Sequence, residues 1–120
     1  MAGRRVNLAL LWATVLALLT GVGAFLVGSP SGSWLIVGHG VVALAILVLT
    51  PGKSAVVNRG IQRRRPGRAL SIVLIFATVA ALVTGVLLVT GSVQAVGPFT
   101  TMQLHVSFGL LTVSLTLIHT

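Results

Sequence analysis

The chain has 120 residues, of which 56% are hydrophobic and 7% are charged, whereas about a quarter of the residues in a soluble domain are charged. It carries eight Lys and Arg residues but no Asp, Glu or Cys. This composition excludes a soluble globular domain, acid–base or proton-relay chemistry by carboxylates, iron–sulfur and thiolate metal sites, and disulfides.

Four apolar segments follow one another along the chain, each close to the ~20 residues that cross a bilayer as a helix. The first covers residues 6–27 and is followed by the turn-forming sequence Gly-Ser-Pro-Ser-Gly-Ser. The second covers 34–50 and is short, so its helix could continue through Pro51. A basic loop leads to the third segment, 69–90, and an uncharged loop leads to the fourth, 101–120. The sequence therefore predicts an all-α membrane protein, a bundle of four transmembrane helices in a single domain.

The basic residues gather at two places along the chain. Two precede the first helix and six lie between the second and third helices: Arg4, Arg5, Lys53, Arg59, Arg63, Arg64, Arg65 and Arg68. Since Lys and Arg beside membrane helices mark the cytoplasmic side, the N-terminus and the central basic loop are expected in the cytoplasm. This layout favours the lipid bilayer, and not nucleic acid, as the partner of the basic residues. A cleaved signal peptide is the alternative for the N-terminus, but its apolar run is long for one.

The first and third helices share a sequence pattern. Residues 8–22 read LALLWATVLALLTGV, and residues 72–86 read IVLIFATVAALVTGV. When the longer outer loop of the second half is allowed for, His39 in the second helix aligns with His105 in the fourth. We therefore expect two parallel two-helix repeats related by an axis along the membrane normal. Two similar helices without symmetry are the alternative.

His39 and His105 are predicted to lie at the same depth, near the outer ends of their helices and on opposite sides of the pseudo-axis. Neutral imidazole is a good iron ligand, and helix bundles build cofactor sites from facing helices. Gly21, Gly85 and Gly109 would leave room for a flat macrocycle near the backbone. We expect a haem b with His39 and His105 as axial iron ligands. Structural histidines, with glycines for tight helix packing, are the alternative.

His119 lies fourteen residues after His105, an advance of about 21 Å and almost four full turns along an α-helix. The two histidines would share a helix face, one near each side of the membrane, which is the spacing that ligates two stacked haems. The residue fourteen positions after His39 is Lys53, so a second haem would lack its matching ligand. One haem is expected, with His119 as the candidate iron ligand for a second.

These residues resemble a known family. Four helices, the His-x13-His pair and the glycines of the intervening helices resemble the haem-carrying core of the cytochrome b superfamily. The fuller pattern is Leu-Thr-Gly-Val, His-Gly, Thr-Pro-Gly-Lys-Ser, an Arg-rich loop, Leu-Val-Thr-Gly-Val and Leu-His-Val. It is similar to the cytochrome b-like membrane domain found ahead of molybdopterin-dependent, sulfite-oxidase-like domains in actinobacteria, and it covers nearly the whole chain.

The resemblance implies an electron-transfer module of the bacterial inner membrane that performs no bond chemistry by itself. Its haem would exchange electrons with a redox domain or partner on the outer side, and with the quinone pool or another partner in the membrane. His39 and His105 match the outer-haem ligands, and His119 matches an inner-haem position. No basic flank follows His119, which is what a chain truncated at its C-terminus, with any catalytic domain in the missing part, would show.

Two other functions compete with electron transfer. A structural or assembly membrane subunit without a cofactor would hold its partners through glycine-lined faces, and haem absorbance distinguishes it from a cytochrome. A small transporter or channel fits less well, because its pathway would have almost no ionisable lining.

Overall fold

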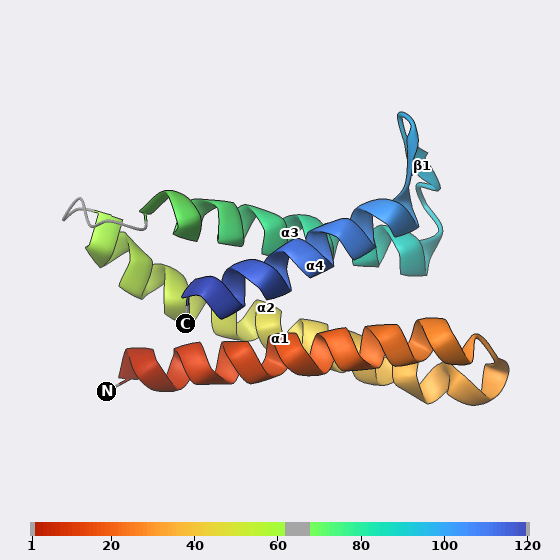
Figure 1. The fold of residues 1–120 in the computed structure, drawn as a ribbon, viewed down its shortest axis with the longest axis horizontal. Helices are drawn as coiled ribbons and strands as arrows, with labels where there is room; N and C mark the ends of the chain where they lie inside the picture. The colour runs from red at the N-terminus through yellow and green to blue at the C-terminus, as the bar shows by residue number, and fades with distance from the viewer. Residues whose placement is uncertain (1, 62–67, 120) are drawn as a thin grey trace. The chain divides into compact units, whose positions relative to one another are not determined.

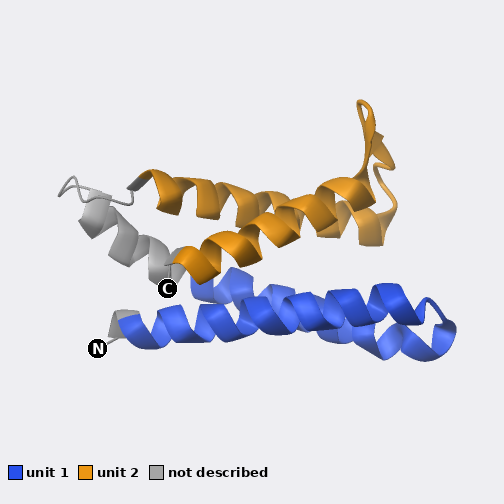
Figure 2. Ribbon diagram, in the orientation of Figure 1, with its two compact units in different colours: residues 1–66, 120 blue, residues 67–119 orange. Residues whose placement is uncertain are grey.

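The computed structural model describes the backbone of residues 2–61 and 68–119, and the side chains of residues 4–50 and 69–118. The elements, in chain order, are α1 (Ala2–Val27), the 3-10 helix η1 (Pro30–Gly32), α2 (Ser33–Ile61), α3 (Arg68–Thr90), the strands β1 (Ala95–Val96) and β2 (Phe99–Thr100), and α4 (Thr101–His119) (Figure 1). They form two compact units (Figure 2), which we name the first helix pair (α1, η1 and α2) and the second helix pair (α3, β1, β2 and α4).

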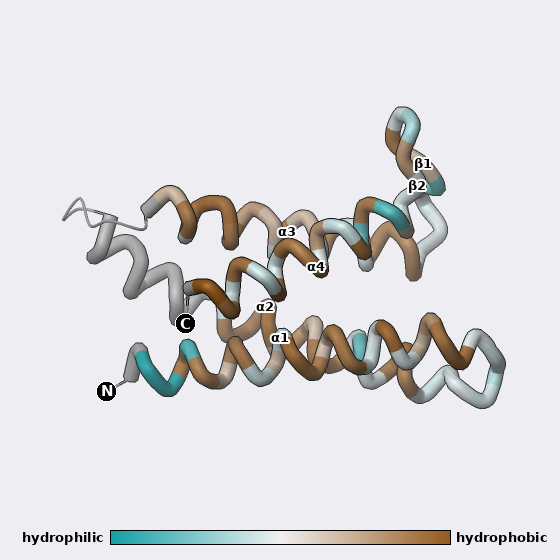
Figure 3. The backbone as a smooth tube through the Cα atoms, viewed as in Figure 1, coloured by the Kyte–Doolittle hydropathy of each residue, from teal (hydrophilic) through white to brown (hydrophobic). Residues whose placement is uncertain are grey.

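The four predicted helices are confirmed, and each is long and apolar enough to cross a membrane. In the described part of the chain, the helical segments long and apolar enough to cross a bilayer are Arg4–Val27, Pro30–Thr50, Ala69–Thr90 and Thr101–Ile118. Hydrophobic residues colour most of their length in Figure 3. Some of these side chains face outward, since Val48 is 76% exposed and Val89 is 82% exposed. Helices that are apolar on all sides are typical of membrane spans, so the exposed apolar surface fits a lipid bilayer.

The second membrane helix is longer than the apolar segment 34–50, because α2 continues through Pro51 to Ile61. Proline has no amide hydrogen, so α2 lacks one helical hydrogen bond at this position. Lys53 and Arg59 therefore lie on a helix, and not in the predicted loop. The other bases of this cluster are Arg68, at the start of α3, and Arg63, Arg64 and Arg65, which lie outside the described residues.

The first helix pair packs through small and aliphatic side chains. Leu10 and Ala13 of α1 and Ile46 of α2 form its buried cluster. Small residues such as Ala13 let two helix backbones approach closely, which favours association inside a membrane. Partly buried residues around this cluster are Val6, Ala17, Val42 and Leu49.

The second helix pair has a similar core. Leu74 and Ala77 of α3 are buried at the positions that correspond to Leu10 and Ala13 in the sequence repeat. Beside this core, the exposed ring of Phe76 and the half-buried ring of Phe108 meet edge to face, with centroids 6.1 Å apart and planes at 82°. This arrangement aligns the positive edge of one ring with the negative face of the other, which is the favoured aromatic geometry.

Threonine hydroxyls are the main buried polar groups of both helix pairs. Apart from Thr101, whose hydroxyl donates to the Val93 carbonyl, each donates a hydrogen bond to the carbonyl four residues earlier in its own helix. The pairs are Thr14 to Leu10, Thr50 to Ile46, Thr78 to Leu74, Thr84 to Ala80, Thr112 to Phe108 and Thr116 to Thr112. As a result, no buried side-chain nitrogen or oxygen among the described residues lacks a hydrogen-bond partner.

A β-hairpin, absent from the sequence-based expectation of an uncharged loop, connects α3 to α4. Ala95 pairs with Thr100 and Val96 pairs with Phe99 in antiparallel register. The turn between the strands is Gly97-Pro98, and Gly97 has a φ of +60°. Glycine at the first turn position adopts this left-handed conformation without strain, as in the two-residue turns typical of β-hairpins.

The hairpin joins α4 through a capping box. The Thr100 N–H donates to Gln103 Oε1 at 2.9 Å, and the Gln103 N–H donates to Thr100 Oγ1 at 3.1 Å. These reciprocal bonds satisfy amides that the first turn of a helix leaves without partners. The sequence signal for this cap is Thr-x-x-Gln.

Replacing Gln103 with alanine is expected to lower the free energy of unfolding by about 1 kcal/mol, because one half of the capping box is lost. Thermal unfolding in detergent, followed by circular dichroism, measures the effect. Gln94→Ala is the matched control, since the Gln94 backbone carbonyl, and not its side chain, accepts the bond from the Thr101 N–H. Equal losses in the two variants would contradict the cap.

Candidate functional site

His39 of α2 packs against Ala17, Thr20 and Gly21 of α1, and we name this set of contacts around the imidazole a histidine seat. Its Nδ1 lies 2.9 Å from the carbonyl oxygen of Ala17 and 3.3 Å from Oγ1 of Thr20. A Cβ atom at Gly21 would lie 3.1 Å from Cε1 and 3.2 Å from Nδ1 of this ring. The absence of a side chain at Gly21 is therefore what lets the imidazole approach the backbone of α1.

His105 of α4 has the same seat on α3. Its Nδ1 lies 2.9 Å from the carbonyl oxygen of Ala81 and 3.4 Å from Oγ1 of Thr84. A Cβ atom at Gly85 would lie 3.0 Å from Cε1 and 3.3 Å from Nδ1. Corresponding distances in the two seats thus differ by no more than 0.1 Å.

The carbonyl partners fix the tautomer of both histidines. A carbonyl oxygen can only accept a hydrogen bond, so Nδ1 carries the proton and donates it to Ala17 in one seat and to Ala81 in the other. In a neutral imidazole, Nε2 then carries the lone pair. Histidines that bind metals commonly donate from one ring nitrogen to a carbonyl and coordinate through the other. Both rings therefore have the proton arrangement of an Nε2 ligand.

Thr20 and Thr84 complete the two seats. Thr20 Oγ1 donates to the Leu16 carbonyl and Thr84 Oγ1 donates to the Ala80 carbonyl, each at 2.7 Å. Each hydroxyl also lies within reach of the alanine carbonyl, at 3.2 Å from Ala17 and 3.0 Å from Ala81. Because the hydroxyl proton goes to a carbonyl of its own helix, Oγ1 presents a lone pair to Nδ1, and the Nδ1–H is shared between the alanine carbonyl and the threonine oxygen. Sequence reasoning did not identify the threonines as site residues. The repeated Thr-Gly pair in helices one and three was the available signal.

The remaining predicted site residues are the glycines and the two residues of the inner position, His119 and Lys53. Gly21 and Gly85, expected to pack against haem, each lie against the histidine ring of their own helix pair. A Cβ atom at Gly109 would meet nothing within 4 Å. His119 is the last residue of α4, whose continuous helix keeps the fourteen-residue spacing from His105. The side chains of His119 and Lys53 lie outside the described residues.

The structure brings each histidine together with the Thr-Gly pair of the neighbouring helix. Among the residues whose side chains are described, no group of three or more His, Cys, Asp or Glu residues could hold a metal ion by itself. His39 and His105 belong to different compact units. That the two rings face each other across a cofactor therefore stays a prediction.

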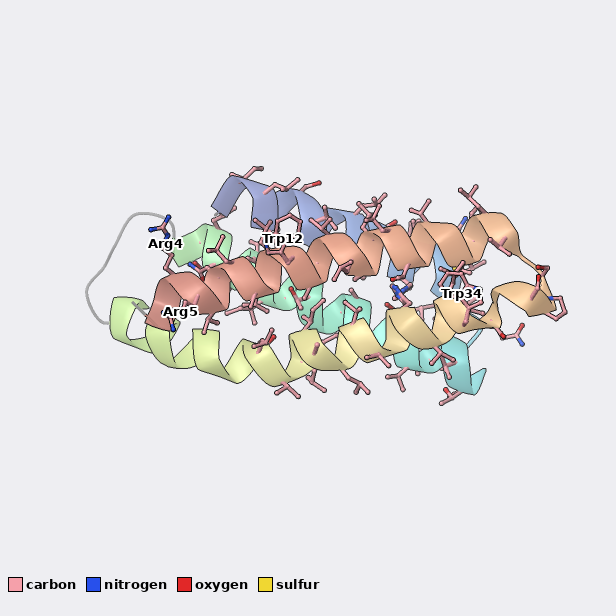
Figure 4. The ribbon with its side chains drawn as sticks, turned by 90° about the horizontal axis from the view of Figure 1, so that it is seen from below. Arg4, Arg5, Trp12 and Trp34 are labelled. Carbon is pink, nitrogen blue, oxygen red and sulfur yellow. The ribbon has the colours of Figure 1, made fainter. Side chains whose placement is uncertain are left out.

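Arginine and tryptophan side chains mark the two ends of the first helix pair. Arg4 and Arg5 lie in the first turns of α1, at the end of the pair opposite Trp34 (Figure 4). Trp12 lies along α1 and is exposed. Because His39 follows Trp34 by five residues in α2, the His39 seat lies in the half of the membrane span farther from the arginines.

No known protein family, curated protein or solved structure matches this chain. The two histidine seats are the polar sites that recur in both helix pairs. They offer two imidazoles that each donate from Nδ1 to a carbonyl of the neighbouring helix, inside apolar helix pairs.

Proposed function

We propose that this chain is an integral membrane module that binds haem b and transfers electrons. The observation that carries the proposal is the recurrence of one imidazole seat, made from a carbonyl, a threonine and a glycine, in both helix pairs. A single hydrogen bond to a neighbouring helix would satisfy a structural histidine. Helix packing alone does not require two seats with the same partners and the same tautomer.

The two seats would suit imidazole ligands of a haem iron. His39 and His105 would coordinate through Nε2, while the bonds from Nδ1 hold each ring in orientation and make it a more basic ligand. When bound, haem supplies a one-electron couple between ferric and ferrous iron. The chain supplies the ligands, their proton arrangement and a low-dielectric surround that keeps water away.

One haem can take both ligands when the two helix pairs form parallel repeats of a four-helix bundle, with His39 and His105 at the same depth. The supporting correspondence is that Ala17, Thr20 and Gly21 match Ala81, Thr84 and Gly85 in sequence and in their contacts. Such repeats would be related by an axis along the membrane normal.

The basic residues orient this bundle in the bacterial inner membrane. Arg4, Arg5 and the cluster from Lys53 to Arg68 would lie in the cytoplasm, which puts both histidine seats in the outer half of the bilayer. The resemblance to the cytochrome b-like membrane domain then suggests the direction of electron flow. Electrons would pass between a redox domain or partner on the outer side and the quinone pool or another partner in the membrane.

One haem per chain is the expected stoichiometry. Lys53 stands where a fourth histidine would complete an inner site with His119. We assign Gly109 to the surface that packs on the macrocycle, since a Cβ atom there meets nothing within its own helix pair.

The test is a dithionite-reduced minus oxidised visible spectrum of the purified chain in detergent, with the haem quantified as its pyridine complex. Sharp α and Soret bands of low-spin haem b, at one haem per chain, are expected. A ratio of two haems per chain would assign His119 to a second site. A chain expressed with ample haem that shows no absorbance would contradict the proposal and favour a structural subunit.

Removing the threonine oxygen from either seat is expected to shift the reduction potential while leaving the haem bound. Thr20→Val and Thr84→Val keep the side-chain shape but weaken hydrogen bonding to Nδ1–H, which makes the ligand less basic and the ferric state less stable. The potential should rise by some tens of millivolts, because about 1.4 kcal/mol corresponds to 59 mV for one electron and one hydrogen bond contributes about 0.5–1.5 kcal/mol.

A spectroelectrochemical titration measures this shift. Thr14→Val and Thr78→Val are the matched controls, since these threonines donate to the Leu10 and Leu74 carbonyls and lie away from the seats. If the control variants shift the potential as much as Thr20→Val and Thr84→Val do, the threonine oxygens do not act through the histidines.

A further inference from the structure

The connections within the two helix pairs differ in kind. In the first pair, a polar turn that contains η1 links α1 to α2. In the second pair, the β-hairpin links α3 to α4 and carries the cross-strand pair Val96 and Phe99. Paired residues lie on the same face of a hairpin. These two side chains are 54% and 55% exposed, so the hairpin presents an apolar face.

This hairpin is held firmly to the start of α4. Thr101 is 1% exposed, and its Oγ1 donates to the Val93 carbonyl at 2.5 Å. The Thr101 N–H donates to the Gln94 carbonyl at 2.9 Å. Together with the capping box, these bonds fix the direction in which the hairpin leaves the helices. Figure 1 shows it projecting sideways from the ends of α3 and α4, and not along their axes.

The hairpin lies between the third and fourth candidate membrane spans. The third membrane span ends at Thr90 and the fourth begins at Thr101. If α3 and α4 cross a bilayer, a hairpin that projects sideways from these span ends would lie along the membrane surface. Val89 and Met102, in the helix turns next to the hairpin, are exposed. Exposed apolar side chains are therefore present both on the helix turns beside the hairpin and on the Val96–Phe99 face.

We propose that the hairpin lies along the membrane surface, with the Val96–Phe99 face against lipid and the Ala95–Thr100 face toward water. The occupant of the apolar face is the boundary between the lipid headgroups and acyl chains, where amphipathic elements lie in the plane of the interface. Because the hairpin is fixed to α4, it would hold the second helix pair at one depth in the bilayer. This anchoring does not depend on haem.

Site-directed spin labelling tests the two faces directly, and the cysteine-free sequence needs no background substitutions. Val96→Cys, Phe99→Cys and Ala95→Cys chains are labelled singly and placed in vesicles of phosphatidylcholine and phosphatidylglycerol. Collision rates are then measured with oxygen, which concentrates in lipid, and with a water-soluble nickel chelate. Labels at positions 96 and 99 should collide mainly with oxygen, and the label at 95 mainly with the chelate.

Two further labels set the scale of this experiment. Val48→Cys, on the exposed face of α2, should report lipid, and Ser31→Cys, in the polar turn of the first pair, should report water. Equal access of the chelate to 95, 96 and 99 would place the hairpin in water and overturn the proposal. Labels at 96 and 99 shielded from both reagents would show that protein covers this face, which overturns it as well. Each of these two positions is tested with the other side chain intact, so the loss of one apolar group cannot decide the result.

Discussion

His39→Ala and His105→Ala are each expected to abolish the spectrum of low-spin haem b. In the proposed haem site, each substitution would remove one of the two imidazole ligands, and the remaining imidazole could not replace it. Haem per chain, measured in the purified variants, should fall from one to near zero. The helix pairs should still form, because the Ala17 and Ala81 carbonyls still accept hydrogen bonds from backbone N–H groups of their own helices when the imidazole is removed. Circular dichroism should therefore match that of the parent chain.

Lys53→Ala is the control for the histidine variants and should leave haem per chain unchanged. His39→Gly and His105→Gly extend the test, because imidazole added to the buffer can occupy the vacated seat and restore the bands. Full haem retention in both single alanine variants would rule out His39 and His105 as the ligands. Loss of haem in His119→Ala alone would move the site to the other end of α4.

Gly85→Val is expected to lose haem almost as completely as the histidine variants, although it leaves the ligand in place. A Cβ atom at this position would lie 3.0 Å from Cε1 of His105, and the two methyl groups of valine would displace the ring further. The ring must then leave its 2.9 Å bond to the Ala81 carbonyl. Gly21→Val should act in the same way on His39, since a Cβ atom there would lie 3.1 Å from the ring.

The smaller substitution Gly85→Ala should weaken haem affinity roughly tenfold, or about 1.4 kcal/mol, because the ring has to move by a few tenths of an ångström. Titration of the haem-free chain with haem measures this change. Gly23→Ala is the control: a Cβ atom there would make an ordinary contact with Leu35, at 3.4 Å from Cδ1, and alanine in a helix is favoured over glycine by about 1 kcal/mol. Equal haem affinities in the Gly85→Ala and Gly23→Ala chains would show that the absence of a side chain at Gly85 is unimportant.

Gly109→Val separates contact with the macrocycle from seating of the histidine. This glycine has space around it within the second helix pair, so valine should leave the His105 seat intact. Haem loss in Gly109→Val, with unchanged helix content, would support its assignment to the haem surface.

The membrane helices could be predicted from the sequence because span length and apolar composition determine them without tertiary information. The continuation of α2 through Pro51 was allowed for by the shortness of segment 34–50, but its extent to Ile61 could not be predicted, because the charges after Pro51 are typical of a helix terminus. Where water can reach a helix, the helix tolerates the loss of the single hydrogen bond that proline removes, because water can bind the carbonyl left without a partner. The β-hairpin was also missed. Its strands have two residues each, which is too short for a periodic pattern, and Gly-Pro is not among the usual hairpin turn signals.

The candidate site could be predicted in part. The sequence repeat identified His39, His105, Gly21 and Gly85, but the glycines were interpreted as space for a macrocycle. The structure adds that each glycine first makes space for an imidazole. The protonated ring nitrogen could not be predicted, because it depends on a carbonyl of another helix. The threonines were missed because hydroxyls inside membrane helices usually bond within their own helix.

Some polar side chains of this protein bond within their own helix and others bond to a neighbouring helix, and this difference affects how the helices can enter the membrane. Thr14 and Thr78 satisfy their hydroxyls within single helices, so they can enter lipid before any partner arrives. The imidazoles of His39 and His105 cannot, since their Nδ1 protons go to the preceding helix of the chain, and an unsatisfied donor in hydrocarbon costs several kcal/mol. The acceptor helix is synthesised first in both pairs. We therefore expect the helix pair to be the unit that inserts into the bilayer, because there each histidine helix meets the carbonyl that its Nδ1 proton needs.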